Sequence, residues 1–406
     1  MRIGIYGGTF NPPHLGHITA ARAVFELLKL DKLLVIPTGH PPHKTLPPGS
    51  PGPERRLEMT RLAMEQTGLG DRVEVSDLEL RREGNSYTAD TLACLKEQYP
   101  EDELWLLMGA DMFLTLQAWR EPERVLSLAG VAAFGRTEED TEELFSVQRD
   151  YLYRTYPQAR IFTLSIPGVV DVSSTELRER LARGEGGSLL APAVYGYILR
   201  EKLYGTAEDL KNLPLERLRP VALSCLHHRR VPHVLGTEQE AIHLAERWGA
   251  DVAKARRAAL LHDCTKKLNL PEQLALAERF QVPLDEMERR EIKLLHAKTG
   301  AGIAEAVFGT DEEITNAIRW HTTGRARMTL LEKVIYLADY IEPTRDFCDL
   351  TELRELAFKD LDRAMLMGLT MAVRDLKERG VPVHSNSVRA RDYLKGKLSD
   401  HEKRQA

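Results

Sequence analysis

The sequence predicts an α/β domain built on a doubly wound parallel sheet, followed by an all-α domain. Three observations lead to this prediction. Short apolar runs alternate with amphipathic stretches up to about residue 205, and helical periodicity almost without strand patterns follows. The length of 406 residues also exceeds what one ordinary hydrophobic core holds, so two domains are expected.

The first half of the chain alternates expected strands with expected helices. Strands are expected at residues 2–6, 32–37, 104–108, 131–134 and 160–166, with a strand-like stretch at 73–80. Helices are expected at residues 16–29, 53–67 and 88–98, the last with Thr88 as its N-cap. Such alternation implies a parallel sheet whose ligands collect at the carboxyl ends of the strands, near a change in strand order.

The pattern changes after Gly205. The stretch "GTAEDLKNLPLERLRP" is polar and contains two prolines, which indicates a linker or a docking segment. We therefore expect domains at residues 1–205 and 221–396, joined by residues 206–220. Helices of the second domain are expected at residues 238–248, 252–266, 271–280, 285–296, 301–308, 312–321, 330–341 and 353–379.

The composition excludes several functional classes. The net charge of −5 gives no electrostatic case for nucleic acid as a partner. No apolar run reaches about 18 residues, and the N-terminus has no signal-peptide pattern, so neither a membrane span nor secretion is expected. The cysteines form no C-x-x-C pair, which suits a reducing cytoplasm and excludes a cysteine zinc site: Cys94, Cys225, Cys264 and Cys348. A homo-oligomer is neither predicted nor excluded.

The stretch "GGTFNPPHLGH" (Gly7 to His17) lies between the first strand and the first helix. Glycines allow a ligand to approach the backbone, and a helix N-terminus attracts phosphate through its free N–H groups. Histidines at such a position can donate to phosphate oxygens. The sequence therefore predicts a phosphate site made by Gly7, Gly8, Thr9, His14 and His17. Neither a Walker P-loop nor a Rossmann G-x-G-x-x-G motif is present.

A second helix start occurs in "DVSSTELRERL" (Asp171 to Leu181). Ser173 and Glu176 have the spacing of a capping box, and capping alone would explain both. It does not explain Ser174, Thr175 and Arg178, which add hydroxyl groups and a guanidinium to a second positively polarised helix end.

These two stretches resemble the HxGH nucleotidyltransferase superfamily, and most closely the bacterial nicotinate mononucleotide adenylyltransferases. The segments "IPTGHPPHK", "SYTADTL", "GADMF" and "PAVYGYI" follow in the expected order over roughly residues 1–205. His14 argues against the pantetheine-phosphate adenylyltransferases, which resemble this pattern with a threonine there. Met112 in "GADMF" and the loose "AFGRTE" depart from the pattern, so the pyridine pocket is less well defined than the ATP site.

The resemblance implies transfer of AMP from ATP, accompanied by Mg²⁺, to nicotinate mononucleotide, with pyrophosphate leaving. No protein nucleophile is required, so catalysis depends on positioning and charge stabilisation. By resemblance, His14, His17 and Arg178 are catalytic, and the ATP-binding residues are Gly7, Gly8, Thr9, Phe10, His14, His17, Gly109, Asp111, Ser173, Ser174 and Arg178. The residues implied for the mononucleotide are Lys44, Thr88, Asp111, Trp119 and Arg136.

In the second half, "AALLHDCTKK" places His262 and Asp263 at the end of an apolar helix. A buried charge without a partner is costly, so this position indicates a bound metal cation. Further candidate ligands lie on other expected helices or at their ends: His233, His296, His321 and Asp339. Imidazole and carboxylate without thiolate suit iron, manganese or another divalent first-row ion, and six groups are enough for two ions.

The order of these residues resembles the HD-domain phosphohydrolases, in particular the bacterial symmetrical diadenosine tetraphosphate hydrolases, over roughly residues 221–395. The stretches "ALLHDCTKK", "HAKTGAGIA" and "YLADYIEPTR" carry the resemblance. It implies that His233, His262, Asp263 and Asp339 ligate one metal, and that His296 and His321 complete a second site or hold phosphate. Lys266, and less clearly Arg345, would contact phosphate.

Two alternatives for the second domain remain open at this point. It could hydrolyse another nucleotide, or it could sense a nucleotide without turnover. The remaining histidines of the second half are expected to be ordinary side chains: His227, His228, His243, His384 and His401.

Overall fold

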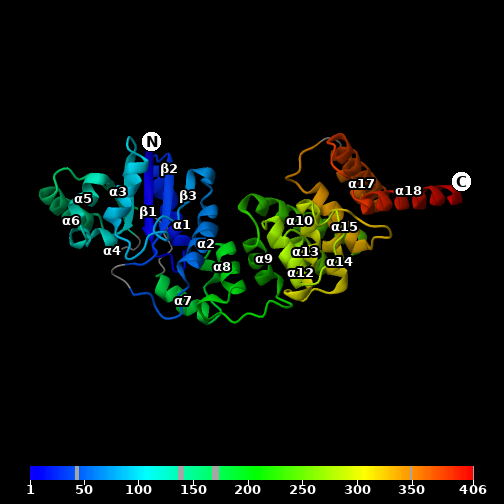
Figure 1. Ribbon diagram of the computed structural model, residues 1–406, viewed down its shortest axis with the longest axis horizontal. Coiled ribbons are helices and arrows are strands. Elements are labelled where there is room, and N and C mark those ends of the chain that lie inside the picture. Colours follow the sequence, from blue (N-terminus) through cyan, green and yellow to red (C-terminus); the bar gives the residue numbers. More distant parts are fainter. Residues whose placement is uncertain (42–44, 136–140, 167–172, 348–349, 406) are drawn as a thin grey trace. The chain divides into compact units, whose positions relative to one another are not determined.

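The computed structural model describes residues 1–41, 45–135, 141–166, 173–347 and 350–405 (Figure 1). The chain forms two compact units, Met1–Glu208 and Asp209–Ala406. Helix α9 (Leu215–Ser224) begins within the stretch expected to be a linker, and it packs on α11 (Val252–Leu261) of the second unit. Within the described ranges, no helix has both the length and the apolar character needed to cross a membrane.

The first unit contains the predicted parallel sheet, with six strands in the order β3-β2-β1-β4-β5-β6. The strands are β1 (Arg2–Gly8), β2 (Lys32–Pro37), β3 (Val73–Val75), β4 (Glu103–Gly109), β5 (Gly130–Gly135) and β6 (Ile161–Ser165). All neighbouring pairs are parallel. The strand order changes direction at β1, whose neighbours are β2 and β4, so the carboxyl ends of β1 and β4 flank the expected ligand crevice.

Helices cover both faces of this sheet, and each face has its own apolar core. One core includes residues of α1 (Leu15–Leu27), α2 (Pro53–Met64), α7 (Ser174–Ala182) and α8 (Pro192–Arg200). The other includes residues of α3 (Thr88–Gln98), α4 (Ala110–Phe113), α5 (Pro122–Leu128) and α6 (Glu142–Thr155). Because β5 is buried along its whole length, its sequence is a continuous apolar run rather than an alternating one.

Two local expectations for the first unit are wrong. The strand expected at 73–80 ends at Val75, because the next residues turn: the backbone amides of Leu80 and Arg81 both donate to the carbonyl of Asp77. Thr88 is the first residue of α3 rather than its N-cap, and Tyr87 occupies the N-cap position without a side-chain cap.

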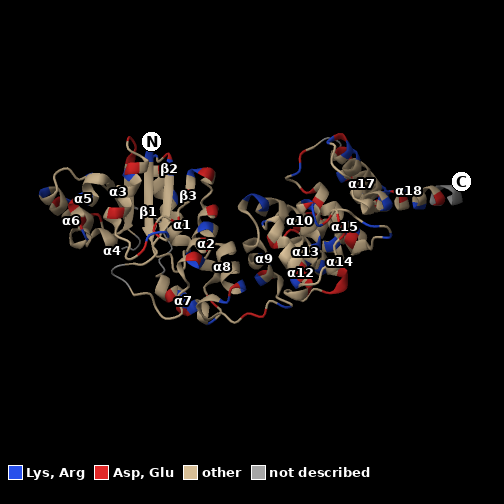
Figure 2. Ribbon diagram, in the orientation of Figure 1, with Lys and Arg blue, Asp and Glu red and all other residues tan. Residues whose placement is uncertain are grey.

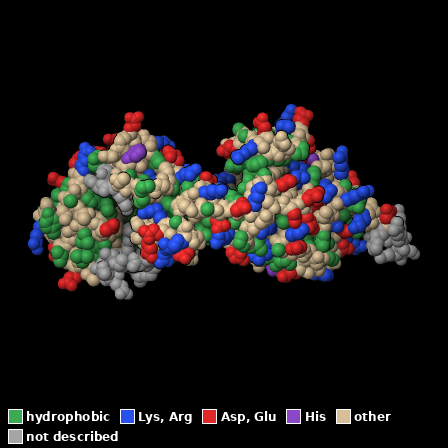
Figure 3. Space-filling model, turned by 90° about the horizontal axis from the view of Figure 1, so that it is seen from below, with side chains coloured by type: hydrophobic (Ala, Val, Ile, Leu, Met, Phe, Trp, Pro, Cys, Tyr) green, Lys and Arg blue, Asp and Glu red, His purple; other side chains and the backbone are tan. Residues whose placement is uncertain are grey.

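Within its described residues, the second unit contains helices and no strand, as predicted. After α9, its helices are α10 (Val231–Trp248), α11 (Val252–Leu261), α12 (Leu270–Arg279), α13 (Ile292–Ala306), α14 (Glu312–Trp320), α15 (Leu330–Ile341), α16 (Leu350–Lys359), α17 (Leu361–Glu378) and α18 (Ser385–Gln405). Helix α10 packs against α11 and α15, and α14 packs against α11, α13 and α15. Figure 2 marks the positions of basic and acidic residues along the ribbon, and Figure 3 shows charged side chains of both signs interspersed over one face.

Several helix boundaries differ from the expected ones. The helices expected at 285–296 and 301–308 are joined in one helix, α13, which begins at Ile292 and runs through residues 297–300. Gly302 lies inside this helix, where a Cβ would lie 2.6 Å from Cγ2 of Val282. The long helix expected at 353–379 divides at Asp360, whose side chain caps α17 by accepting from the amide of Arg363. Helix α18 was not expected.

Candidate functional sites

A cavity of about 560 Å³ opens in the first unit at the carboxyl ends of β1 and β4. Its lining includes eleven of the residues expected to contact nucleotides: Gly7, Gly8, Thr9, His14, His17, Thr88, Gly109, Asp111, Trp119, Ser173 and Ser174. Phe10 and Arg178 are not in this lining. Lys44 and Arg136 lie outside the described residues. Both predicted helix starts, the one at His14 and His17 and the one at Ser173 and Ser174, therefore line the same cavity.

The two motif histidines are coupled at the start of α1. The backbone N–H of His14 donates to Nδ1 of His17 at 3.2 Å, and the two rings have centroids 3.9 Å apart. Because Nδ1 of His17 accepts this hydrogen bond, a neutral His17 ring carries its proton on Nε2. His17 can then offer an N–H donor to an anion in the cavity that it lines.

The start of α7 forms half of the predicted capping box. The Ser173 hydroxyl accepts from the amide of Glu176 at 3.1 Å, but the Glu176 carboxylate pairs with Arg180 instead of the N-cap amide. Arg178 donates to the backbone carbonyl of Asn11 at 2.8 Å and to the Thr175 hydroxyl at 2.9 Å. Arg178 therefore braces the first motif.

Phe10 supports the site from the core. Its ring is buried and lies edge-on to Tyr6, with its centroid 5.2 Å from that of His17. The Phe10 backbone has a left-handed φ of 45°, which is uncommon for an aromatic residue. This conformation shapes the turn that precedes α1.

Two buried charged residues near this cavity were missed by sequence reasoning. Glu79, which is 7% exposed, lines the cavity and accepts a hydrogen bond from the Thr91 hydroxyl at 2.8 Å. Burial raises the pKa of the Glu79 carboxyl. Arg56 is 1% exposed, and its guanidinium donates to the backbone carbonyl of Thr9 in the first motif. The sequence could have indicated that Arg56 is buried, because it lies on the apolar side of α2, four residues before the buried Thr60.

The six predicted metal ligands meet in the second unit. His233 lies on α10 and Asp339 on α15, and the Nε2 of His233 is 3.0 Å from Oδ1 of Asp339. Helix α11 ends at Leu261, which leaves His262 and Asp263 in the turn that follows. His296 comes from α13, and its Nε2 is 3.1 Å from Oδ1 of Asp263. His321 follows α14 and completes the group.

The hydrogen bonds of three histidines assign their tautomers. Nδ1 of His262 lies 2.6 Å from the Ala259 carbonyl, Nδ1 of His321 lies 2.7 Å from the Ile318 carbonyl, and Nδ1 of His233 lies 3.0 Å from Oε1 of Glu342. Each Nδ1 must donate, because its partner accepts, so each neutral ring has its lone pair on Nε2. Two of these lone-pair nitrogens, those of His233 and His262, are only 3.3 Å apart.

The histidine nitrogens lie close to the carboxylates of Asp263 and Asp339. Lone pairs and negative charges at such short distances repel one another unless a positive charge lies between them. Burial lowers the pKa of His262 and, strongly, that of His321, so these rings are neutral near pH 7. Burial alone would raise the pKa of Asp263, but neighbouring His262 and a hydrogen bond with His296 hold that pKa well below its ordinary value. Within the described part of the chain, Nδ1 of His296 is buried without a hydrogen-bond partner. This donor set fits a divalent cation.

Three cationic side chains border these ligands. Nζ of Lys266 is 2.9 Å from Nε2 of His296, and the Arg345 guanidinium is 3.0 Å from Asp339. Arg230, which sequence reasoning missed, pairs with Asp263. These groups supply positive charge where an anionic substrate would meet the ligands.

Glu342 orients His233 from behind and was also missed. It is fully buried and accepts hydrogen bonds from both the hydroxyl and the amide of Thr344. A glycine makes room for it, because a Cβ at Gly236 would lie 2.7 Å from Oε2 of Glu342. Such a carboxylate fixes the tautomer of a metal-binding histidine.

A third acid–histidine cluster lies outside these sites. Nε2 of His384 is 2.7 Å from Oδ2 of Asp285, and Nδ1 of His384 accepts from the Asn386 amide. Nearby Glu288 is paired with the buried Lys298 at 3.2 Å. His384 was expected to be an ordinary side chain, and these contacts give it a structural setting: they connect the residue before α18 to the turn before α13.

Comparisons with known proteins agree with this division. Residues 5–180 match the cytidylyltransferase-like family, and residues 230–344 match the HD domain. A probable nicotinate-nucleotide adenylyltransferase of Desulfitobacterium hafniense (strain Y51) is 41% identical over 206 residues, which are 50% of this chain and 95% of that protein. The chain belongs to the nicotinate-nucleotide adenylyltransferase family. Its first unit carries that membership, and its second unit contains an HD domain.

Other relatives match each half separately. A probable nicotinate-nucleotide adenylyltransferase of Shewanella sp. (strain MR-7) is 39% identical to the adenylyltransferase-family unit over 217 residues, which are 50% of this chain and 99% of that protein. A solved structure from Clostridium acetobutylicum, described as a predicted HD superfamily hydrolase involved in NAD metabolism, is 38% identical. The match covers 46% of this chain and 98% of that one, with a TM-score of 0.44.

Proposed function

We propose that the first unit transfers the adenylyl group of ATP to nicotinate mononucleotide. The observation that carries this proposal is the single cavity that both His14 and His17 and the start of α7 line. Membership of the nicotinate-nucleotide adenylyltransferase family supports the choice of substrates.

In this reaction a phosphate oxygen of the mononucleotide attacks the α-phosphorus of ATP, and the bond from that phosphorus to the leaving pyrophosphate breaks. Charge develops on the phosphate oxygens, where His14, His17 and the two helix N-termini donate hydrogen bonds. Asp111, Thr88 and Trp119 border the part of the cavity that we assign to the mononucleotide, and Lys44 and Arg136 are proposed as further contacts. Mg²⁺ bound to ATP supplies additional neutralising charge.

A substrate panel tests this proposal. Purified protein with ATP should form a dinucleotide from nicotinate mononucleotide, and dinucleotide formation from nicotinamide mononucleotide should be compared in parallel. Equal rates with nicotinate mononucleotide and with phosphopantetheine would contradict the assignment.

For the second unit, we propose a divalent metal centre, of iron, manganese or another first-row ion, that hydrolyses phosphoanhydrides. Diadenosine tetraphosphate is the proposed substrate, with water adding across its central anhydride to give two molecules of ADP. His233, His262, Asp263, His296, His321 and Asp339 would hold the metal, and the converging lone pairs of the histidines support this ligand set. A bound metal supplies Lewis acidity toward phosphate oxygens and water. Lys266 and Arg345 would bind the negative charge of the substrate.

Metal analysis together with an ADP-release assay tests the second proposal. Hydrolysis of diadenosine tetraphosphate to ADP by protein that contains metal would support it. Selective hydrolysis of another nucleotide would replace the substrate, and tight nucleotide binding with metal present but no product would favour a sensing role.

A further inference from the structure

Arg56 is a buried cation whose hydrogen bonds go to two backbone carbonyls. Its guanidinium donates to the Thr9 carbonyl at 2.8 Å and to the Gly39 carbonyl at 3.1 Å, while its Nε is buried and has no hydrogen-bond partner. Burial lowers the pKa of Arg56, and its interactions with Tyr204 and with the charge of Glu54 offset this shift only in part. Arginines are almost never fully buried unless they are paired, so one that donates to carbonyls here needs an explanation.

The two carbonyls that Arg56 binds belong to segments beside the cavity. In a trans peptide the C=O and the next N–H point in opposite directions. Drawing the Thr9 oxygen toward Arg56 therefore turns the Phe10 N–H away from it. Thr9 lines the cavity, and Phe10 holds the left-handed φ of 45°. A left-handed residue in such a turn is typical of the backbone concavities that bind anions.

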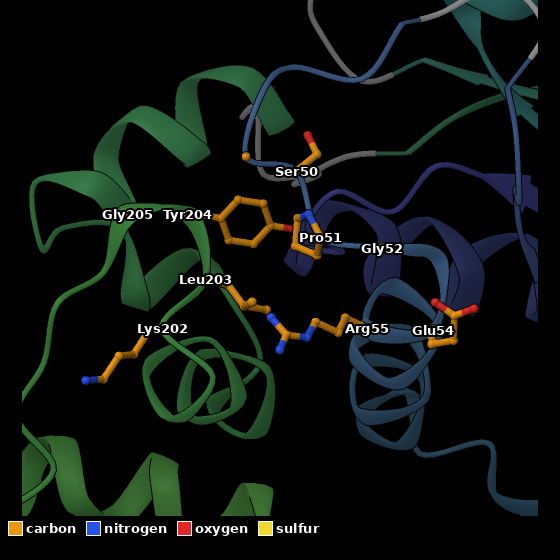
Figure 4. Close-up of a pocket in the computed structure, with 10 residues that line it drawn as sticks. Ser50, Pro51, Gly52, Glu54, Arg55, Lys202, Leu203, Tyr204 and Gly205 are labelled. Atoms are coloured by element: carbon orange, nitrogen blue, oxygen red, sulfur yellow. The ribbon is translucent and has the colours of Figure 1, made fainter.

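A second set of contacts, which involves no charged group, also holds this turn. The side chain of Asn11 accepts from the Tyr204 hydroxyl at 2.7 Å and donates to the Ser50 hydroxyl at 2.9 Å. Figure 4 shows the Tyr204 ring pointing toward the segment at Ser50 and Pro51. This brace fixes the turn without adding charge, so it provides a matched control for Arg56.

We propose that Arg56 is a positioning residue for the triphosphate of ATP: it fixes the orientation of the Thr9–Phe10 peptide and supplies buried positive charge next to this turn. The inference rests on the proposed adenylyl transfer. An anion in the cavity offsets the desolvation of Arg56, so part of the binding energy of the triphosphate comes from a side chain that never touches it.

The test compares Arg56→Met, Arg56→Lys and Tyr204→Phe in the full chain. Dinucleotide formation gives the KM for ATP, the KM for the mononucleotide and kcat. Arg56→Met should raise the KM for ATP by about tenfold and leave the KM for the mononucleotide unchanged. Arg56→Lys, which keeps the charge but loses the fork, should give an intermediate value. Tyr204→Phe should lower the melting temperature, raise the KM for ATP less than Arg56→Met does, and leave the KM for the mononucleotide unchanged.

Two outcomes would overturn the proposal. One is an unchanged KM for ATP in Arg56→Met, or in Arg56→Lys if the methionine variant does not fold. The other is an equal rise in Tyr204→Phe, which would show that Arg56 only stiffens the turn.

A direct titration separates this proposal from the proposed reaction. Calorimetry with inorganic tripolyphosphate should give a binding signal that His17→Ala abolishes, which excludes binding by the second unit. That signal should weaken about tenfold in Arg56→Met. If the native chain shows this signal but forms no dinucleotide, the proposed reaction is wrong while the role of Arg56 stands. An absent or unchanged signal overturns the role itself.

Discussion

Glu342→Gln should weaken metal binding in the second unit without removing any ligand. Both carboxylate oxygens of Glu342 are used: Oε1 lies 3.0 Å from Nδ1 of His233 and accepts from the Thr344 hydroxyl, and Oε2 accepts from the Thr344 amide. Glutamine has one acceptor oxygen, so one of these contacts must fail. A lost hydrogen bond to a charged group costs about 1.5–3 kcal/mol, which agrees with the about 10–100-fold loss of metal affinity typical of such supporting residues.

The assay is a titration of metal-free protein with Mn²⁺ or Co²⁺ against a competing chelator. Glu332→Gln is the control, because Glu332 is also fully buried on α15, where it pairs with Arg325 at 2.8 Å. The control should lower the melting temperature and leave metal affinity unchanged. Metal affinity equal to that of the native chain in Glu342→Gln, or an equal loss in both variants, would refute the reasoning.

Three further predictions concern the independence of the units and the pH dependence of folding. His17→Ala should reduce dinucleotide formation by at least about 10²–10³-fold and spare ADP release, as measured by product analysis; loss of both activities in folded protein would contradict independent sites. Asp263→Ala should abolish metal binding and ADP release but leave dinucleotide synthesis intact, which metal analysis and the same product assays check. Burial raises the pKa of Glu79, so its folded form holds a proton more tightly than its unfolded form. Its stabilising contribution is therefore present below the unfolded pKa and is lost as the pH rises through the folded pKa. Glu79→Gln, which cannot titrate, should thus gain in melting temperature relative to the native chain as the pH rises above the ordinary pKa of a glutamate, and a pH-independent difference would count against this.

The sequence was sufficient for the features that repeat along the chain. Continuous apolar runs such as β5 indicated a parallel sheet, and polar residues at the end of an apolar helix indicated that His262 and Asp263 would belong to a polar cluster. Features that depend on contacts between distant segments left no such pattern. Residues 297–300 looked like a break between two helices, but α13 runs through them. Val282 also lies against Gly302 in this helix, a contact that the sequence does not show.

The missed supporting residues illustrate the same limit. No sequence pattern marks Glu342, because its role depends on a contact with His233, which lies 109 positions away in the chain. Arg56 could have been noticed on the buried side of α2, but its carbonyl partners come from loops 47 and 17 positions away. Side-chain partners at such separations are set by the tertiary fold and not by local periodicity.

The braces on Asn11 have a consequence for the order in which the protein is made. Its partners Arg178 and Tyr204 are synthesised 167 and 193 positions later, near the end of the first unit. During synthesis, the first motif therefore cannot form its hydrogen bonds with Arg178 and Tyr204 until the end of the first unit has been made. A nascent chain released before residue 204 would already contain every strand of the sheet, yet Asn11 would lack its hydrogen bond from Tyr204.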